Sequence, residues 1–206
     1  VYKQSIAEQN SVDLAWEVFT SPEYKDLRLC IYTSTEELRR FRQLIVNTVM
    51  ATDIADKSLN ALRKARWQRA FSESNEESTN ESPLQVEDRK ATIVIEHLIQ
   101  ASDVAHTMQH WHVFRKWNEC LFQEMYAAFR AGRAATDPSL GWYQSEIGFF
   151  DFYVIPLAKK LDSCGVFGVS SDEYLSYAEA NREEWVREGE KLVQLYVENR
   201  SEQEIV

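Results

Sequence analysis

The stretch STEELRRFRQLIVNTVMATDI, residues 34–54, indicates the fold class most clearly. Ser34 and Glu37 have the spacing of a capping box, in which each side chain accepts a hydrogen bond from a backbone N–H at the start of a helix. From Leu38 onward, apolar residues recur three and four apart, which places them on one helical face. The stretch therefore predicts an amphipathic helix that begins at the capping box.

The same apolar spacing recurs along the whole chain, and only 6 Gly and 4 Pro interrupt its 206 residues. The segment KSLNALRKARWQRAF (57–71) predicts a second helix with a basic outer face. Further helices are predicted at about residues 10–20, 90–101, 107–131, 144–162 and 171–196. We therefore expect an all-α protein, folded over residues 1–206 as a single domain.

Two segments read as connections between helices. SESNEESTNESPLQVED (72–88) has almost nothing to bury, which predicts a mobile acidic loop. It is either a solvated linker or a loop that is phosphorylated or binds a partner. AGRAATDPSLGW (131–142) contains Pro138 and Gly141 and predicts a second loop.

Composition excludes several classes of protein. The formal net charge of −10 argues against a partner with a nucleic-acid backbone, which needs a basic surface. Cys30, Cys120 and Cys164 form no CxxC motif, which favours a reducing compartment. No apolar run approaches the roughly 20 residues that cross a bilayer, so we expect this segment to make no membrane contact. A cytoplasmic or cytoplasm-facing location fits best, with any tether outside the segment.

All four histidines lie in IEHLIQASDVAHTMQHWHVFRKW (95–117), together with Asp103. Asp103 follows an apolar helix, so its carboxylate is expected near or inside the core, where it needs a hydrogen bond, a proton or a cation. A helix-end role and a metal or catalytic role both remain open. His106 and His110 are four apart and would share a helical face, but HTMQH lacks the glutamate of HExxH, so structural roles are favoured over a zinc site.

SEIGFFDFYVIPLAKKL (145–161) combines a carboxylate with aromatic residues. Glu146 stands one turn before Phe149 and Phe150, which suits a planar heterocycle that needs a stacking surface and an edge contact. The alternative is an aromatic core helix with Glu146 in its first turn.

Five motifs in order, ATD, ASD, RKW, SEIGFFDFxxxPL and NREEW, resemble the C-terminal two thirds of the class I 3′,5′-cyclic-nucleotide phosphodiesterase catalytic domain. The resemblance runs from about Ser5 to Glu188. It implies an all-α domain of the HD-like phosphodiesterase type. It also implies a pocket with zinc and magnesium, or manganese, in which metal-activated hydroxide attacks the cyclic phosphate of cAMP or cGMP. Local metal cations would attract an anionic substrate to this acidic chain.

The resemblance also implies roles for individual residues. Asp103 matches an aspartate that ligates the zinc, and Asp53 matches a residue that supports the metal site from behind its ligands. Phe149 matches the phenylalanine that stacks on the purine. The other positions implied to line the substrate pocket are Glu146, Ile147, Val104, His106, Phe114, Trp117 and Asn118.

Two departures from the family pattern stand out. Glu146 occupies the position of a glutamine that hydrogen-bonds the purine edge, and an ionised carboxylate accepts hydrogen bonds but does not donate them. The preference between cAMP and cGMP is therefore open. The family's HNxxH and HDxxH motifs, which hold most metal ligands and the catalytic histidine, are absent from these 206 residues. We therefore expect an N-terminally truncated domain that contains no catalytic residue of its own and is inactive alone.

Three hypotheses follow. The leading one is that the full-length protein hydrolyses cyclic nucleotides. The second is a non-catalytic helical module that binds a nucleotide or a partner, and the third is a zinc hydrolase that uses HTMQH. Homodimer formation is left open by the sequence.

Overall fold

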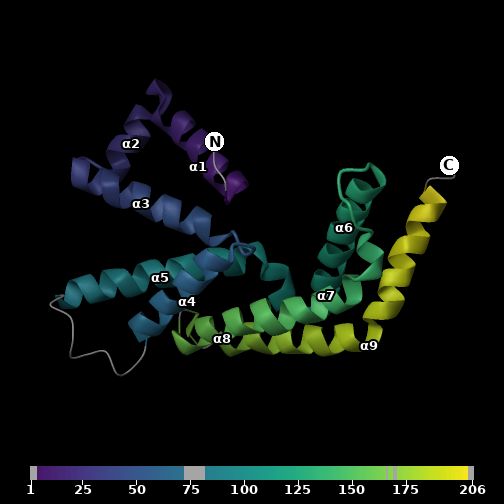
Figure 1. Ribbon diagram of the computed structural model, residues 1–206. Coiled ribbons are helices and arrows are strands. Elements are labelled where there is room, and N and C mark those ends of the chain that lie inside the picture. Colours follow the sequence, from purple (N-terminus) through teal and green to yellow (C-terminus); the bar gives the residue numbers. More distant parts are fainter. Residues whose placement is uncertain (1–3, 72–81, 166, 169–170, 204–206) are drawn as a thin grey trace. The chain divides into compact units, whose positions relative to one another are not determined.

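The computed structural model describes residues 4–71, 82–165, 167–168 and 171–203. Within these ranges the chain consists of helices and connecting turns and has no β-strand, which confirms the all-α prediction (Figure 1). None of the helices in the described part is long and apolar enough to cross a membrane. The chain divides into two compact units, Val1–Asp103 and Val104–Val206. That both units form a single domain stays a prediction.

The first unit begins with three helices and a short 3-10 turn. They are α1 (Ile6–Thr20), η1 (Pro22–Tyr24), α2 (Lys25–Ile31) and α3 (Thr35–Ala51). The predicted capping box opens α3, since Ser34 Oγ accepts from the Glu37 N–H at 3.2 Å and Glu37 Oε2 accepts from the Ser34 N–H at 3.0 Å. The short α2 was not predicted.

An aromatic cluster joins α1 to α3. Phe41 on α3 lies 5.5 Å from Phe19 and 6.3 Å from Trp16 on α1, measured between ring centroids, and 6.2 Å from Tyr32 at the end of α2. Such tilted aromatic pairs contribute about 0.5–1.5 kcal/mol each beyond the area that they bury. The cluster therefore helps to hold the first helices of this unit together.

The next helices, α4 (Lys57–Phe71) and α5 (Pro83–Asp103), pack against each other. The bounds of α4 match the prediction, but its basic residues do not all lie on an outer face. Arg63 is 8% exposed and donates to the carbonyls of Met50 at 3.0 Å and Asp53 at 2.8 Å, near the C-terminal end of α3. A helix end leaves such carbonyls without internal partners, which is why an inward arginine is stabilised here.

The prediction of a loop over residues 72–88 is wrong at its C-terminal end. Residues 72–81 lie outside the described residues, but α5 already begins at Pro83. Two reciprocal hydrogen bonds cap the start of this helix. The Gln85 side chain accepts from the Ser82 N–H at 2.8 Å, and Ser82 Oγ accepts from the Gln85 N–H at 3.4 Å. A proline at the first helical position fits the same helix start.

The helices of the second unit pack on one side of a long C-terminal helix, α9 (Ser171–Gln203). The other elements are η3 (Ala105–Met108), α6 (Trp111–Arg130), η4 (Pro138–Leu140), α7 (Trp142–Phe149), the π-helical turn η5 (Phe150–Val154) and α8 (Ile155–Ser163). In Figure 1, α7, η5 and α8 follow one another alongside α9, and all three pack on it. Two predicted helices differ from the observed ones. The helix predicted at 107–131 starts only at Trp111, and the helix predicted at 144–162 is interrupted by the π turn.

The core of this unit is aromatic. Phe114 on α6 meets Phe150 on η5 at 5.2 Å and Trp185 on α9 at 5.8 Å, both edge to face, and all three side chains are fully buried. Phe122 on α6 packs on Tyr196 of α9 at 5.5 Å. Truncating one such buried ring costs about 3–5 kcal/mol. The walls of the candidate site described next are anchored in this core.

A proline follows directly after the π turn. Pro156 has no N–H, and its ring would clash with the carbonyl of Phe152, four residues earlier, in a regular helix. The wider turn at Phe150–Val154 falls at this point and lets the helical path continue into α8.

Candidate functional site

The α7 helix presents a carboxylate and an aromatic ring on one side. Glu146 and Phe149 are three residues apart and therefore neighbours on the helix surface, and both are half-buried. The Phe149 ring lies nearly parallel to that of Tyr153, with centroids 5.3 Å apart and 15° between the planes. Ile147 is also half-buried. This part of α7 combines a polar group with apolar surface, as a site for a planar ligand requires.

Burial controls the charge of Glu146. It raises the pKa of Glu146 to about 7, and a hydrogen bond from the Asn118 side chain opposes this rise without cancelling it. No cation in the described part of the chain contributes to the shift. The neutral acid and the carboxylate are therefore both populated near neutral pH.

The α6 helix holds three of the predicted pocket residues in two different environments. Trp117 is 54% exposed, whereas Phe114 and Asn118 are 0% and 2% exposed. Asn118 Oδ1 accepts from the indole N–H of Trp142 at 3.1 Å. Trp117 is thus open to a ligand, and the other two lie behind the surface.

The η3 turn carries His106. Its ring is half-buried and parallel to that of Phe114, with centroids 6.4 Å apart, and burial lowers the pKa of His106 and so favours neutral imidazole. Val104, which precedes η3, is 9% exposed. The expectation that His106 and His110 share a helical face is wrong, because His106 lies in η3 whereas His110 caps the start of α6.

The other histidines have structural contacts. His110 Nε2 lies 3.0 Å from the Tyr177 hydroxyl of α9, and its ring stacks on His112 at 5.8 Å. In the first unit, His97 is 1% exposed, with Nδ1 2.7 Å from the Ile93 carbonyl and its ring on Trp67.

Residues of the NREEW motif connect α9 to the candidate site, a role that the sequence did not indicate. The buried Asn181 side chain donates to the carbonyls of Thr107 at 2.9 Å and Gln109 at 2.7 Å, on either side of the end of η3. Arg182 holds Asp151 of the π turn through two hydrogen bonds, of 2.5 and 2.9 Å.

Trp185, from the same motif, reaches α7. Its indole N–H donates to the carbonyl of Tyr143 at 3.1 Å. Gly189, one turn later, allows this close approach, because a Cβ there would lie 2.7 Å from the Trp185 ring and 2.9 Å from that of Tyr143. The α9 helix therefore fixes η3, α7 and η5 at once.

Asp103 is the last residue of α5 and belongs to the first unit. Of the two expected positions, near or inside the core, the second is wrong, because the Asp103 side chain is exposed; partial desolvation still raises its pKa. A helix end at Asp103 turns the carboxylate outward although Ala101, two residues earlier, is buried. Among the described residues, no group of three or more His, Cys, Asp or Glu side chains could hold a metal ion. Asp103 by itself thus does not build a metal site.

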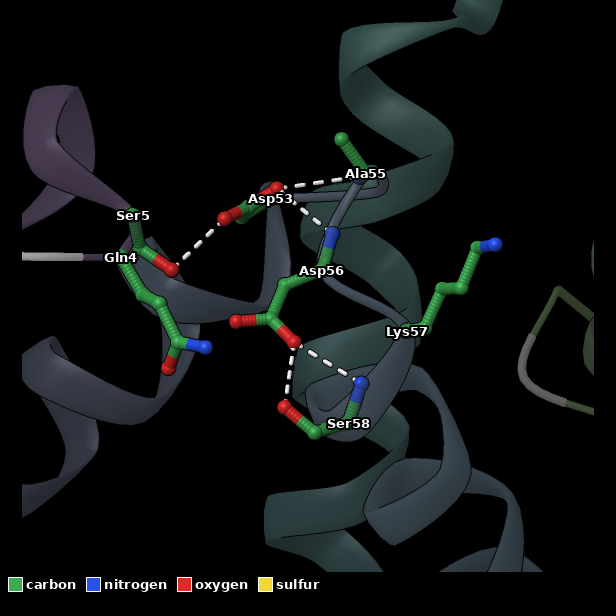
Figure 2. Close-up of a pocket in the computed structure, with 7 residues that line it drawn as sticks. All are labelled: Gln4, Ser5, Asp53, Ala55, Asp56, Lys57 and Ser58. Carbon is green, nitrogen blue, oxygen red and sulfur yellow. Dashed lines mark hydrogen bonds between the residues drawn. The ribbon is translucent and has the colours of Figure 1, made fainter.

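Asp53 lies in the connection between α3 and α4, beside an open pocket of about 470 Å³ in the first unit (Figure 2). Its Oδ1 accepts from the N–H groups of Ala55 and Asp56 at 3.0 and 3.1 Å, and its Oδ2 accepts from Ser5 Oγ at 2.6 Å. Asp56 in turn accepts from the Ser58 N–H at 2.8 Å. The carboxylates that line this pocket therefore shape the start of α4 and bind the residue before α1.

Comparison with known proteins gives a consistent match. The family model described as 3′5′-cyclic nucleotide phosphodiesterase matches residues 1–165. The dual specificity calcium/calmodulin-dependent 3′,5′-cyclic nucleotide phosphodiesterase 1C of Homo sapiens is 25% identical over 166 residues, which cover 74% of this chain and 20% of that protein. Its Mus musculus counterpart is 24% identical over the same share. The chain thus spans about a fifth of the length of the curated relatives that it matches.

Solved structures agree at the level of the fold. The phosphodiesterase domain of Salpingoeca rosetta rhodopsin phosphodiesterase matches with a TM-score of 0.63 and 18% identity, over 98% of this chain and 57% of that one. A second structure, of the phosphodiesterase domain of the RhoPDE fusion protein from the same organism, gives a TM-score of 0.61 at 18% identity, over 95% of this chain and 59% of that one.

Proposed function

The chain belongs to the 3′,5′-cyclic nucleotide phosphodiesterase family, and from this membership we propose that the protein containing it hydrolyses cAMP, cGMP or both to the 5′-monophosphate. The observation that carries the proposal is the family match over residues 1–165, which includes the ATD, ASD, RKW and SEIGFF motifs. The curated relatives are named as dual-specificity enzymes, which supports testing both nucleotides.

We propose that the exposed and half-buried residues of the second unit form the wall that binds the nucleotide. Phe149 offers a ring face for the purine and Glu146 a polar edge contact, since both lie on one side of α7. The other proposed wall residues are Ile147, His106 and Trp117. Val104, Phe114 and Asn118 are buried, so their proposed contribution is to hold this wall in place.

The family generally uses divalent metals, and we propose zinc together with magnesium or manganese for this protein. Asp103 is the proposed ligand from this chain, because its exposed carboxylate is free to reach a cation. Asp53 is the proposed supporting residue. The described residues do not by themselves complete a metal site.

The test is a hydrolysis assay of the protein that contains this chain, with cAMP and cGMP, in Mg²⁺ or Mn²⁺ and after removal of metals with a chelator. We expect turnover of at least one nucleotide, lost on chelation. Asp103→Ala should abolish turnover and lower the zinc content measured by elemental analysis. Glu87→Ala, which removes an exposed carboxylate from the same helix, is the matched control and should change neither.

Two results would overturn the proposal in different ways. If neither nucleotide is hydrolysed with metals present, the protein is a non-catalytic helical module. If Asp103→Ala keeps wild-type turnover and zinc content, the metal assignment is wrong while the activity stands.

A further inference from the structure

Two side chains from other helices hold the end of α3. Gln100 on α5 donates through Nε2 to the Ala51 carbonyl at 2.9 Å, and Arg63 on α4 donates to the neighbouring Met50 carbonyl at 3.0 Å. Gln100 is 5% exposed and Ala51 is 1% exposed, so the hydrogen bond between them is shielded from water. Many helices end on a glycine that turns the chain, but Thr52, the residue after α3, keeps helical dihedral angles. The end of α3 is therefore set by distant partners.

The hydrogen bond from Gln100 separates two possible paths of the chain after α3. If the helix continued, the Ala51 carbonyl would accept from the N–H of Ala55, four residues later. In the structure the Ala55 N–H instead donates to Asp53 Oδ1 at 3.0 Å, and the Asp56 N–H donates to the same oxygen at 3.1 Å. The Ala51 carbonyl is then left for Gln100. Gln100 thus satisfies the carbonyl that would otherwise draw Ala55 into another turn of helix.

The path of the chain after α3 also determines where the Asp53 carboxylate lies. In the observed turn this carboxylate is held at both oxygens, because Ser5 Oγ donates to Oδ2 at 2.6 Å (Figure 2). A longer α3 would take the Ala55 N–H away from it. Gln100 and Asp103 are three residues apart on α5 and are neighbours on its surface. The hydrogen bond from Gln100 therefore holds the Asp53 turn near the part of α5 that carries Asp103.

We propose that Gln100 is a positioning residue for the metal site, which keeps Asp53 in its turn near the end of α5 that carries Asp103. This inference rests on the proposed function, in which Asp103 binds a metal and Asp53 supports the site. Carboxylate oxygens are ligands of both zinc and magnesium, so the two residue types suit these metals. Gln100 acts through the Ala51 carbonyl, since its amide donates there.

The first experiment measures the zinc affinity of the protein that contains this chain, by competition with a chromophoric chelator. Gln100→Met keeps the length of the side chain but removes the donor. Zinc affinity should fall about 10–100-fold, as is typical when a residue behind the metal ligands is lost. Gln100→His restores an N–H donor and should return zinc affinity to within about threefold of the wild type. Gln68→Met, the same change at an exposed site on α4, is the control and should leave zinc affinity unchanged.

The second experiment follows the path of the chain after α3, without metal or nucleotide. The ¹³C methyl signal of Ala55, identified as the alanine signal absent from Ala55→Ser, reports whether this residue is helical. The signal should move toward the helical value in Gln100→Met and keep its wild-type position in Gln100→His and Gln68→Met. If the methionine variant does not fold, Gln100→Ser takes its place, because its hydroxyl is too short to reach the Ala51 carbonyl.

The outcomes separate the inference from the proposed function. A purely structural role of Gln100 would lower the melting temperature of Gln100→Met but leave the zinc affinity and the Ala55 signal of the folded protein unchanged, and this result would overturn the inference. Loss of zinc affinity without movement of the Ala55 signal would also contradict it, because Gln100 would then act by another route. If the wild type neither binds zinc nor hydrolyses a cyclic nucleotide while the Ala55 signal still moves in Gln100→Met, the proposed function is wrong and the control of the Asp53 turn by Gln100 stands.

Discussion

The Nη1 atom of Arg66 on α4 lies 2.8 and 3.0 Å from the two carboxylate oxygens of Glu96 on α5. The Glu96 side chain is 3% exposed, and burial raises its pKa while Arg66 opposes the rise. Arg66→Met should leave a buried carboxylate without its partner and lower the free energy of unfolding by on the order of 3 kcal/mol, measured by urea denaturation at pH 7.

A matched control and a double variant make this first prediction specific. Arg69→Met removes an exposed arginine from the same helix and should change stability by less than about 0.5 kcal/mol. The double variant Arg66→Met with Glu96→Met should recover most of the loss. An Arg66 variant as stable as the Arg69 variant would show that the pair contributes nothing.

The raised pKa of Glu146 predicts a pH-dependent stability. The folded protein keeps this proton up to about pH 7, whereas an ordinary glutamate releases it near pH 4.5. The cost of ionising Glu146 is therefore absent below pH 4.5, grows between these values and is complete above pH 7. Glu146→Gln should stabilise the protein at pH 8 by at most about 3 kcal/mol and have little effect at pH 4. Thermal unfolding of the wild type and the variant at pH 4 and pH 8 measures this difference in stability. An equal gain in stability at both pH values would contradict the prediction.

The Asn181 amide should be essential for the structure around His106. Asn181→Ala leaves the carbonyls of Thr107 and Gln109 without their donor, and the buried Thr107 carbonyl accounts for a cost of about 1–3 kcal/mol. Hydrogen exchange should become faster in η3 before it does in α8. Glu183→Ala, at an exposed position of α9, is the control; equal exchange in both variants would count against the role of Asn181.

The two helical glycines at Gly189 and Gly148 should respond in opposite directions to alanine. A Cβ at Gly189 meets the buried Trp185 ring at 2.7 Å, so Gly189→Ala should destabilise by about 1–3 kcal/mol and change the tryptophan fluorescence. The nearest atom to a Cβ at Gly148 is 3.9 Å away on Phe152, so Gly148→Ala should gain up to about 1 kcal/mol from helix propensity. A stabilised Gly189 variant would show that α7 and α9 separate easily.

The sequence predicts the elements whose signals are local. The capping box at Ser34 and Glu37 correctly places the start of α3, and α4 begins and ends where the pattern predicts. The same kind of signal, Ser82 followed by Pro83 and Gln85, starts α5, but it lies at the end of an acidic segment whose composition predicts a loop.

Features that depend on distant partners could not be predicted. Nothing near Arg66 in the sequence shows that its carboxylate lies 30 residues away, and basic residues are expected to face solvent. Asn181 belongs to a motif that the sequence displays, but its acceptors are more than 70 residues away. At the candidate site, the sequence of α7 indicates a carboxylate beside aromatic residues. The hydrogen bond that Asn118 accepts could not be predicted, because its donor, Trp142, lies 24 residues further on.

The number of residues in the π turn at Phe150–Val154 sets the rotation of α8 relative to α7 about the helical path. One residue more or fewer in a helical path rotates everything beyond it by about 100°. Removing a single residue from the turn would thus keep Glu146 and Phe149 in place but swing the buried Leu157 and Leu161 away from their present neighbours. Length changes during evolution are therefore expected to be excluded from this turn, even where its side chains vary.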